Sequence, residues 1–218
     1  MRVVIAGGHG QIALLLEQLL ATRGDAVTAL VRNPDHFGDV QDAGAVPVLC
    51  DLESADVDSV AAYLNGADAA VFAAGAGAGS GAARKDTVDY GAAALFASAA
   101  VEAGVRRFVQ VSTVGIEAAD SPSVDPEFAV YLKAKKLAED DLKSRDLDWT
   151  ILRPGPLVND APTGLVTLAA PRLPRASVTR ADVAAVLAEL LNAPGTVGKT
   201  LELVNGETPV ADAVRAIL

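Results

Sequence analysis

The chain has 218 residues, 51% of them hydrophobic and 21% charged, which is ordinary for a globular protein and excludes a disordered or fibrous chain. Its net charge of -10 and its aromatic content of only 4% argue against polymeric nucleic acid as a partner. The single cysteine, Cys50, cannot form an internal disulfide, and we find no pattern of a secretory leader or a membrane span. We therefore expect a cytoplasmic protein without membrane contact.

Runs of aliphatic and β-branched residues alternate with Ala- and Leu-rich segments of helical length, which predicts βαβ units around a parallel sheet. The expected strands are 2–6, 26–31, 45–50, 69–74, 107–112, 149–153 and 200–204. The expected helices are Gln11–Thr22, Asp56–Leu64, Thr87–Ala103, Phe128–Ser144, Arg180–Leu191 and Val210–Ile217. Thr179 and Asp182 form a capping box in front of the fifth of these helices. We expect a Rossmann-type, doubly wound α/β fold with helices on both faces and a small C-terminal elaboration. Residues 1–218 would form one domain, in which 154–218 contribute the substrate side.

The first predicted strand runs into the sequence GGHGQIA, which starts at Gly7 and opens the first predicted helix. The spacing G-x-x-G-x-x-A places Gly7 at a tight turn, Gly10 where the backbone would approach a diphosphate, and Ala13 where the helix packs on the strand. The diphosphate of a dinucleotide would lie at the helix N-terminus. The alternative is a plain strand-to-helix turn that needs flexible residues, but the position directly after an apolar strand favours the dinucleotide.

The second predicted strand ends at Arg32, where an NAD-specific fold usually carries Asp or Glu for the ribose 2′-hydroxyl. A guanidinium at this place would pair with a 2′-phosphate, so we expect NADP(H) to be favoured over NAD(H). Asp51 would accept a hydrogen bond from the adenine amino group, and the small residues 73–75 would let the backbone lie along the ribose. The structural alternatives are a solvated charge for Arg32 and a turn cap for Asp51. The predicted cofactor-binding residues on these segments are Gly7, Gly8, His9, Gly10, Gln11, Ile12, Arg32, Asn33, Asp51, Leu52, Ala73, Ala74 and Gly75.

Candidate catalytic groups follow the fifth predicted strand. Ser112 and Thr113 stand at its end, and the next predicted helix carries Tyr131 and Lys135, whose spacing of four residues puts both side chains on one helical face. A phenol is a poor acid at neutral pH, but a neighbouring ammonium stabilises its phenolate and makes proton exchange with a carbonyl oxygen feasible. A nicotinamide would supply the hydride. The structural alternative is that Tyr131 covers the apolar edge of the helix and Lys135 is a solvated charge.

Two Pro-rich loops, 118–126 and 154–175, interrupt the alternation of strands and helices, and long loops in compact domains are often functional. We expect them to wall the substrate pocket. Their aliphatic side chains would face an apolar ligand, pack inward or contact another subunit. These side chains are Leu157, Val158, Leu165 and Leu168.

No metal site is expected. His9 and His36 lie far apart in the sequence and are poorly supported by cysteine or carboxylate neighbours. The oligomeric state stays open, a homo-oligomer included.

Taken together, these segments resemble the short-chain dehydrogenase/reductase superfamily, in its atypical, NmrA-like or NAD(P)H-binding branch. The resemblance covers nearly the whole chain and rests on AGGHGQIA, LVRNP, CDL, AGVRRFVQVSTVG, YLKAKKLAEDDL, LDWTILRPGPL, SVTRADVA and GKTLELVNGETPV. The catalytic positions that it implies are Tyr131, Lys135 and either Thr113 or Ser112. It also implies that Lys135 holds the nicotinamide ribose and that Pro154 and Gly155 line the nicotinamide pocket.

The expected function is an NADP(H)-dependent oxidoreductase that reduces a small, apolar carbonyl compound or a quinone by hydride transfer. Because the NmrA-like branch includes proteins that bind NADP and act as redox sensors or regulators, a non-catalytic NADP(H) sensor is the alternative. Sugar-nucleotide epimerases and dehydratases share the architecture. They usually carry a larger C-terminal substrate region than the roughly 65 residues that follow Arg153.

Overall fold

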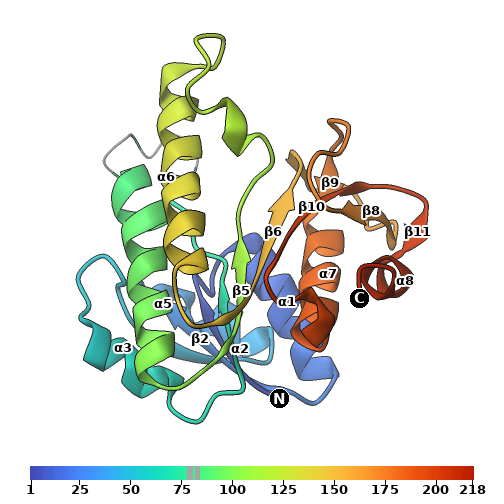
Figure 1. The fold of residues 1–218 in the computed structure, drawn as a ribbon. Coiled ribbons are helices and arrows are strands. Elements are labelled where there is room, and N and C mark those ends of the chain that lie inside the picture. The colour runs from blue at the N-terminus through green and yellow to red at the C-terminus, as the bar shows by residue number, and fades with distance from the viewer. Residues whose placement is uncertain (78–80, 82–83) are drawn as a thin grey trace.

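The apolar strands form the centre of one sheet in the computed structural model, which describes residues 1–77, 81 and 84–218. Within these residues nine strands pair in the order β11-β8-β10-β6-β5-β4-β1-β2-β3 (Figure 1). They are β1 (Arg2–Ala6), β2 (Ala26–Val31), β3 (Val46–Leu49), β4 (Ala69–Phe72), β5 (Arg107–Val111), β6 (Asp148–Pro154), β8 (Leu165–Ala169), β10 (Lys199–Asn205) and β11 (Thr208–Pro209). A separate parallel pair consists of β7 (Leu157–Val158) and β9 (Val178–Thr179).

The pairing makes the sheet mostly parallel. Strands β1 to β6 run parallel to their neighbours and β10 runs parallel to β6, whereas β8 is antiparallel to both β10 and β11. The strand order reverses between β1 and β4, since β2 and β3 extend the sheet beyond β1 while β5 and β6 extend it beyond β4. In open α/β sheets, ligands bind beyond the carboxyl ends of the strands at such a switch point. The glycine turn after β1 and residues 73–75 after β4 meet there.

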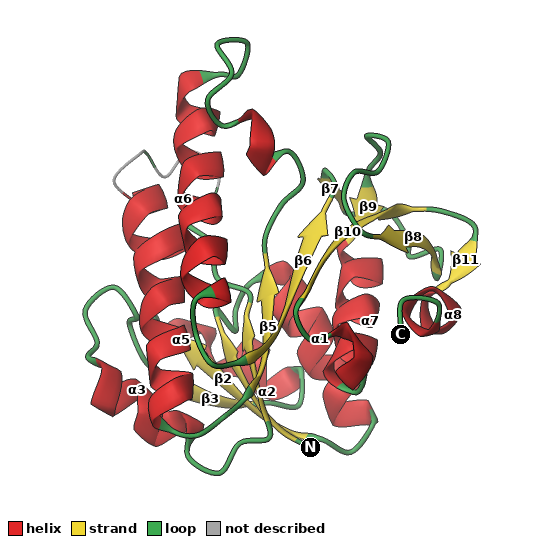
Figure 2. Ribbon diagram, viewed as in Figure 1, coloured by secondary structure: helices red, strands yellow, loops and turns green. Residues whose placement is uncertain are grey.

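Helices cover both faces of the sheet (Figure 2). One face carries α1 (Gln11–Thr22), α2 (Phe37–Asp42), α7 (Arg180–Leu191) and α8 (Val210–Arg215). The other face carries the π-helix η2 (Lys85–Ala92), α3 (Val57–Leu64), α5 (Ala93–Glu102) and α6 (Pro126–Lys143). Short 3-10 turns are η1 (Pro34–His36), η3 (Ile116–Ala118) and η4 (Pro194–Thr196). No helix in the described part of the chain is both long and apolar enough to span a membrane.

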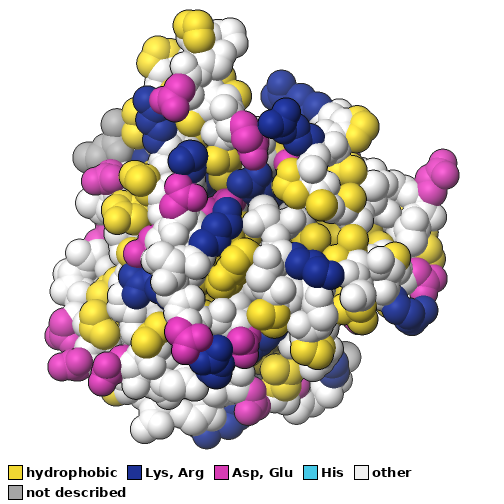
Figure 3. Space-filling view, in the orientation of Figure 1, with side chains coloured by type: hydrophobic (Ala, Val, Ile, Leu, Met, Phe, Trp, Pro, Cys, Tyr) yellow, Lys and Arg dark blue, Asp and Glu magenta, His cyan; other side chains and the backbone are white. Residues whose placement is uncertain are grey.

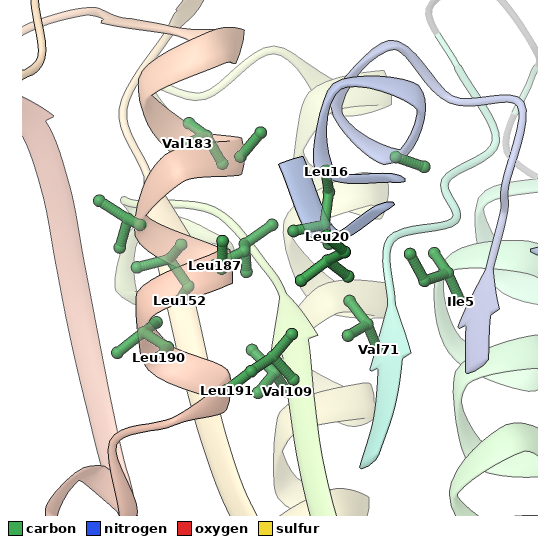
Figure 4. Close-up of a cluster of buried hydrophobic side chains, with 14 of the residues drawn as sticks. Ile5, Leu16, Leu20, Val71, Val109, Leu152, Val183, Leu187, Leu190 and Leu191 are labelled. Atoms are coloured by element: carbon green, nitrogen blue, oxygen red, sulfur yellow. The ribbon is translucent and has the colours of Figure 1, made fainter. Parts of the chain in front are cut away.

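A hydrophobic core lies on each face because side chains alternate along the strands. In β1, Val3 and Ile5 belong to the core beneath α1 and α7, whereas Val4 and Ala6 belong to the core beneath α3 and α5. Figure 4 shows the first of these cores, in which leucines of α1 and α7 pack over the central strands. Full burial of one such side chain contributes roughly 1.5–3 kcal/mol. The two cores therefore hold the carboxyl ends of the central strands in fixed positions.

All the predicted strands and helices are present, with ends that shift by a few residues. The helix predicted at Thr87–Ala103 divides into η2 and α5. The helix predicted to start at Phe128 starts at Pro126, because the Asp125 carboxylate caps it and accepts a hydrogen bond from the Phe128 N–H at 3.0 Å. The predicted Thr179 cap is confirmed, since its hydroxyl oxygen accepts a hydrogen bond from the Asp182 N–H at 3.0 Å. The Asp182 carboxylate reaches back to the Thr179 hydroxyl, which donates to it at 2.8 Å.

The structure corrects the prediction in two segments. The predicted loop 154–175 contains β7 and β8, and β8 alternates buried and exposed side chains as it pairs with β10. Residues 32–44, to which the sequence assigns no element, contain η1 and α2, and α2 buries Val40. The four elements β7, β8, η1 and α2 are short. Their hydrophobic periodicity is therefore too weak for the sequence pattern to indicate them.

Candidate functional site

Three cavities form one continuous cleft at the carboxyl ends of the central strands. The first cavity measures about 220 Å³ and includes Gly7, Arg32 and Asp51 in its lining. The second measures about 600 Å³ and includes Gln11 and Lys135, and the third measures about 790 Å³ and includes Thr113 and Gly155. The first and second share Gly10, Ala73, Ala74 and Gly75, and the second and third share Phe128, Tyr131, Leu157 and Arg180. A cleft of these dimensions has room for a small-molecule ligand.

The glycine turn lies where the first two cavities meet. Gly7 has a φ of +82°, and a side chain there would bring its Cβ within 2.6 Å of the Ala74 backbone, so the tight turn expected of Gly7 is confirmed. A Cβ on Gly8 would lie 2.5 Å from the Ala29 Cβ, which makes Gly8 a packing residue beneath the turn. Gly10 precedes α1, and no side chain of the described residues caps this helix. Its first N–H groups are therefore available to an anion such as a diphosphate, and the helix dipole favours a negative charge there.

Two guanidinium groups lie at the outer end of the first cavity. Arg32 is half exposed, and its Nη1 lies 3.5 Å from the Glu53 carboxylate. Arg84 Nη2 donates to the same carboxylate at 2.8 Å, and the Thr87 hydroxyl donates to it at 2.7 Å. The Thr87 hydrogen bond, followed by Arg84, holds the pKa of Glu53 below its usual range. Glu53 thus pairs with both guanidinium groups, and the Asp51 carboxylate lines the same cavity, so the formal charges at this end of the cleft balance.

Arg84 is a residue that the sequence analysis missed. It lies far from Arg32 along the chain and belongs to no motif, so only the packing of the segment before η2 against the β3 end shows their proximity. Asp51 lines the same cavity, and its carboxylate accepts a hydrogen bond from the Glu53 N–H at 3.1 Å. Asp51 therefore caps the turn at Glu53, as its structural alternative predicted. The role of Asp51 as an acceptor for the adenine amino group stays a prediction.

The two histidines are neighbours in space. The rings of His9 and His36 stack with centroids 3.5 Å apart, and His9 Nε2 lies 2.7 Å from the Asp39 carboxylate. Their separation in sequence was thus a poor guide to their distance. Among the described residues, no group of three or more potential metal ligands is present. The Asn33 side chain accepts a hydrogen bond from the Asp35 N–H and caps η1.

Buried Cys50 lines the first cavity, and so does Leu52, which the sequence predicts to bind the cofactor.

Lys135 is buried and held by a carboxylate. Its Nζ lies 3.1 Å from Asp89, whose side chain is 1% exposed, and 3.4 Å from the Val111 carbonyl oxygen. Asp89 also accepts a hydrogen bond from the Ala76 N–H at 3.3 Å. These contacts rule out a freely solvated charge for Lys135. They fix its ammonium group in the wall of the second cavity.

Two ammonium groups lie close to the Tyr131 ring. Lys135 Nζ is 5.9 Å from the centre of the Tyr131 ring, and Lys85 Nζ is 5.2 Å from it. Lys85 is buried and donates to the Gly77 carbonyl oxygen at 2.6 Å. The sequence analysis missed both Lys85 and Asp89. Lys85 and Asp89 are four residues apart on η2, which is a spacing that can place two side chains on the same face of a helix. A π-helix, however, has no simple sequence pattern that would predict this face.

The two candidate hydroxyl groups have different surroundings. Ser112 lines the second cavity, but its hydroxyl donates at 2.8 Å to Glu139, which is 1% exposed and accepts two hydrogen bonds from Arg153. Burial would raise the pKa of Glu139, yet Arg153 foremost among its partners keeps it below the usual value. Thr113 lines the third cavity and makes one 3.3 Å contact with the Val114 carbonyl oxygen. The Thr113 hydroxyl is therefore better placed than that of Ser112 to meet a ligand.

The predicted pocket loops contribute to the third cavity. Gly155 lines it, and a Cβ there would collide with the Ala176 carbonyl oxygen. The Pro154 carbonyl accepts a hydrogen bond from the Val114 N–H at 3.1 Å, which braces the segment that carries Thr113. Of the aliphatic residues expected in the pocket, Leu157 lines the cleft, whereas Leu168 packs inward in the core under α7.

Comparison with known proteins identifies the family of the chain. A family model described as NAD(P)H-binding matches residues 7–194. The chain is 34% identical to a Bacillus subtilis (strain 168) protein named "Uncharacterized sugar epimerase YhfK", with all of both chains covered. The residues 7–194 that the family model matches contain the glycine turn, the Tyr131 helix and most of the residues that line the third cavity.

Two solved structures show the fold with close agreement. A Bacillus halodurans protein named for the NAD-dependent epimerases/dehydratases superposes with a TM-score of 0.92 at 38% identity, covering 99% of both chains. The anaerobillin reductase ChuY of Escherichia coli O157:H7 superposes with a TM-score of 0.80 at 26% identity, covering 94% of this chain and 97% of that one. Their names span reductases and epimerases, so they leave the substrate of the present chain open.

Proposed function

This chain belongs to the NAD(P)H-binding family of oxidoreductases, and we propose that it is an NADP(H)-dependent reductase of small carbonyl compounds or quinones. The observation that carries the proposal is the position of Tyr131. Its side chain lines both the second cavity, which begins at the glycine turn, and the third, which the C-terminal loops enclose. A proton donor at this junction would face both a cofactor in the second cavity and a substrate in the third.

The residues of the first two cavities fit a dinucleotide. The uncapped N-terminus of α1 would bind the diphosphate, and Lys135, fixed by Asp89, would hydrogen-bond the nicotinamide ribose. Arg32 and Arg84 would bind a 2′-phosphate, for which Glu53 is the internal competitor. Arg32 and Arg84 lie close enough to share the Glu53 carboxylate, so a 2′-phosphate would replace Glu53 as their common partner, and this supports NADP(H) over NAD(H).

The chemistry divides between cofactor and protein. When bound, the nicotinamide ring supplies the hydride. Tyr131 donates its phenolic proton to the carbonyl oxygen of the substrate, and the ammonium groups of Lys85 and Lys135 stabilise the phenolate that results. The Thr113 hydroxyl donates a hydrogen bond to the same oxygen and orients it.

The test is NADPH consumption, followed at 340 nm, with a panel of aldehydes, ketones and quinones. We expect turnover by the wild type, and a loss of about 10²–10⁴-fold in kcat for Tyr131→Phe with NADPH affinity unchanged. Tyr63→Phe, which alters an exposed tyrosine outside the cleft, is the matched control. NADPH binding without turnover of any panel member would favour a redox sensor instead.

Sugar epimerisation is the second candidate, because the Bacillus subtilis relative bears that name. An epimerase oxidises a sugar carbon and reduces it again, so it consumes no net NADPH and changes only the stereochemistry of its substrate. NMR distinguishes epimerisation from reduction when sugar nucleotides are incubated with the protein and a small, substoichiometric amount of NADP⁺. A new epimer without net cofactor consumption would replace the reductase proposal.

A further inference from the structure

The third cavity combines an apolar wall with several arginines. Its apolar side chains include Val124, Phe128, Leu132, Leu157 and Leu173. Arg172 and Arg175 reach it from the segment between β8 and β9, and Arg180 reaches it from the start of α7. In Figure 3 Lys and Arg side chains gather at the upper rim of the notch between helix α6 and the C-terminal strands. Such a concentration of positive charge is unusual in a chain with a net charge of -10.

The carboxylates of the cavity already have partners. Glu117 accepts a hydrogen bond from Arg153 Nη1 at 2.6 Å, and Arg153 is itself buried behind the cavity. Glu202 accepts a hydrogen bond from the Leu173 N–H at 2.7 Å. Arg172 interacts electrostatically with Glu117, which it shares with Arg153. The four guanidinium groups of Arg153, Arg172, Arg175 and Arg180 thus outnumber the two carboxylates, and positive charge remains in excess.

Two of the three arginines lack an anionic partner within the described residues. Arg180 donates to the neutral amide of Asn159 at 2.7 Å. Arg175 makes no hydrogen bond or ion pair with any residue that the structure describes. Together with Arg172, which has only a shared carboxylate nearby, these guanidinium groups can bind an external anion in a bidentate manner.

We propose that the third cavity selects substrates that carry a carboxylate or phosphate group on an apolar body, with the anion bound by Arg172 and Arg175. The inference rests on the proposed reductase function, because it concerns the same site. Tyr131 lines the second and third cavities, whereas Arg172 and Arg175 line the third alone. The reducible group of the substrate therefore lies at Tyr131, and its anionic group lies at the arginines on the side away from the glycine turn.

The first experiment measures binding and needs no turnover. The wild type, saturated with NADP⁺, is titrated by calorimetry with naphthalene-2-carboxylate, 2-naphthyl phosphate and the neutral naphthalene-2-carboxamide. We expect at least one anion to bind about tenfold or more tightly than the amide, because hydrogen bonds to charged groups are stronger than neutral ones. The stronger of the two anions identifies the group that the site prefers. Equal affinity for the amide and both anions would overturn the proposal.

Variants then locate the anion. In the double variant Arg172→Ala/Arg175→Ala the preference for the anion should fall to about twofold or less. Both side chains are exposed, so their removal leaves the core intact. Arg215→Ala is the matched control, since Arg215 is an exposed arginine that contacts Asp212 outside the cleft. An unchanged preference in the double variant, or an equal loss in Arg215→Ala, would refute the role of Arg172 and Arg175.

Turnover separates this inference from the proposed function. The two substrates are 6-formyl-2-naphthoate and its methyl ester, assayed with NADPH. A kcat/KM about tenfold or more in favour of the acid supports both proposals. Equal values would overturn the anion site and leave the reductase standing. Selective binding of naphthoate without reduction of either aldehyde would support the anion site and refute the reductase.

Discussion

A buried glutamate beneath the glycine turn should make the stability of this protein depend on pH. Glu17 of α1 has no solvent exposure, and neither of its carboxylate oxygens has a hydrogen-bond partner among the described residues. Its Oε1 lies 3.2 Å from the place that a Cβ on Gly8 would occupy. Burial without a compensating cation raises the pKa of Glu17 from 4.5 to about 8, so the folded protein holds this carboxyl neutral at pH 7.

The sign follows from proton binding. Between the two pKa values the unfolded chain releases a proton that the folded protein retains, so the free energy of unfolding falls as pH rises. The loss is at most about 1.4 kcal/mol per pH unit, or on the order of 4–5 kcal/mol across the window from 4.5 to about 8. The stabilisation by neutral Glu17 is complete below pH 4.5 and fully lost above about pH 8.

Urea unfolding of the wild type and of Glu17→Gln, measured at pH 5, 6, 7 and 8, isolates this contribution. The amide keeps the shape of the neutral carboxyl but does not titrate. We therefore expect the stability difference between the two proteins to change by several kcal/mol in favour of Glu17→Gln as pH rises. Other titrating groups contribute equally to both proteins and cancel. Parallel pH profiles for the two would refute the reasoning.

Three further predictions concern the cleft. Arg84→Ala should raise the Kd for NADPH about tenfold and leave that for NADH within about twofold, as measured by nicotinamide fluorescence, whereas Arg106→Ala, outside the cleft, should change neither. Equal effects on both cofactors would exclude Arg84 from 2′-phosphate binding. Thr113→Ala should lower kcat about 100-fold with NADPH affinity unchanged, whereas Ser112→Ala should mainly lower the urea midpoint. A loss of kcat in Ser112→Ala but not in Thr113→Ala would assign the role of orienting the substrate carbonyl to Ser112. Asp89→Asn leaves the buried Lys135 ammonium unpaired and should cost about 3–5 kcal/mol in urea unfolding, much of it recovered in Asp89→Asn/Lys135→Met. A loss below about 1 kcal/mol would show that the ion pair does not hold Lys135.

The sequence predicts well what local patterns determine. The central strands and the glycine turn follow from short apolar runs and from the conformation that Gly7 must adopt, and the structure reproduces them. The helix cap at Thr179 depends on residues three positions apart, and it forms. Such features need no knowledge of the rest of the fold.

The sequence does not predict contacts between residues that lie far apart in the chain. The approach of Arg84 to Glu53, of Lys85 to Tyr131, and of His9 to His36 depends on how helices and loops pack on the sheet. The pairing of Lys135 with Asp89 changes the interpretation of Lys135, because its charge is balanced by a carboxylate that no motif marks. The strand β8 was hidden by prolines on both sides, although its alternating burial fits an edge of the sheet.

The most direct test of the account is an equilibrium titration of the wild type with NADPH and with NADH at physiological ionic strength. We expect saturable binding of NADPH at one site per chain, tighter than that of NADH, and competition by NADP⁺. If neither dinucleotide binds, then the cleft at the glycine turn has another occupant, and the roles assigned to Tyr131, Lys135 and Arg32 are wrong.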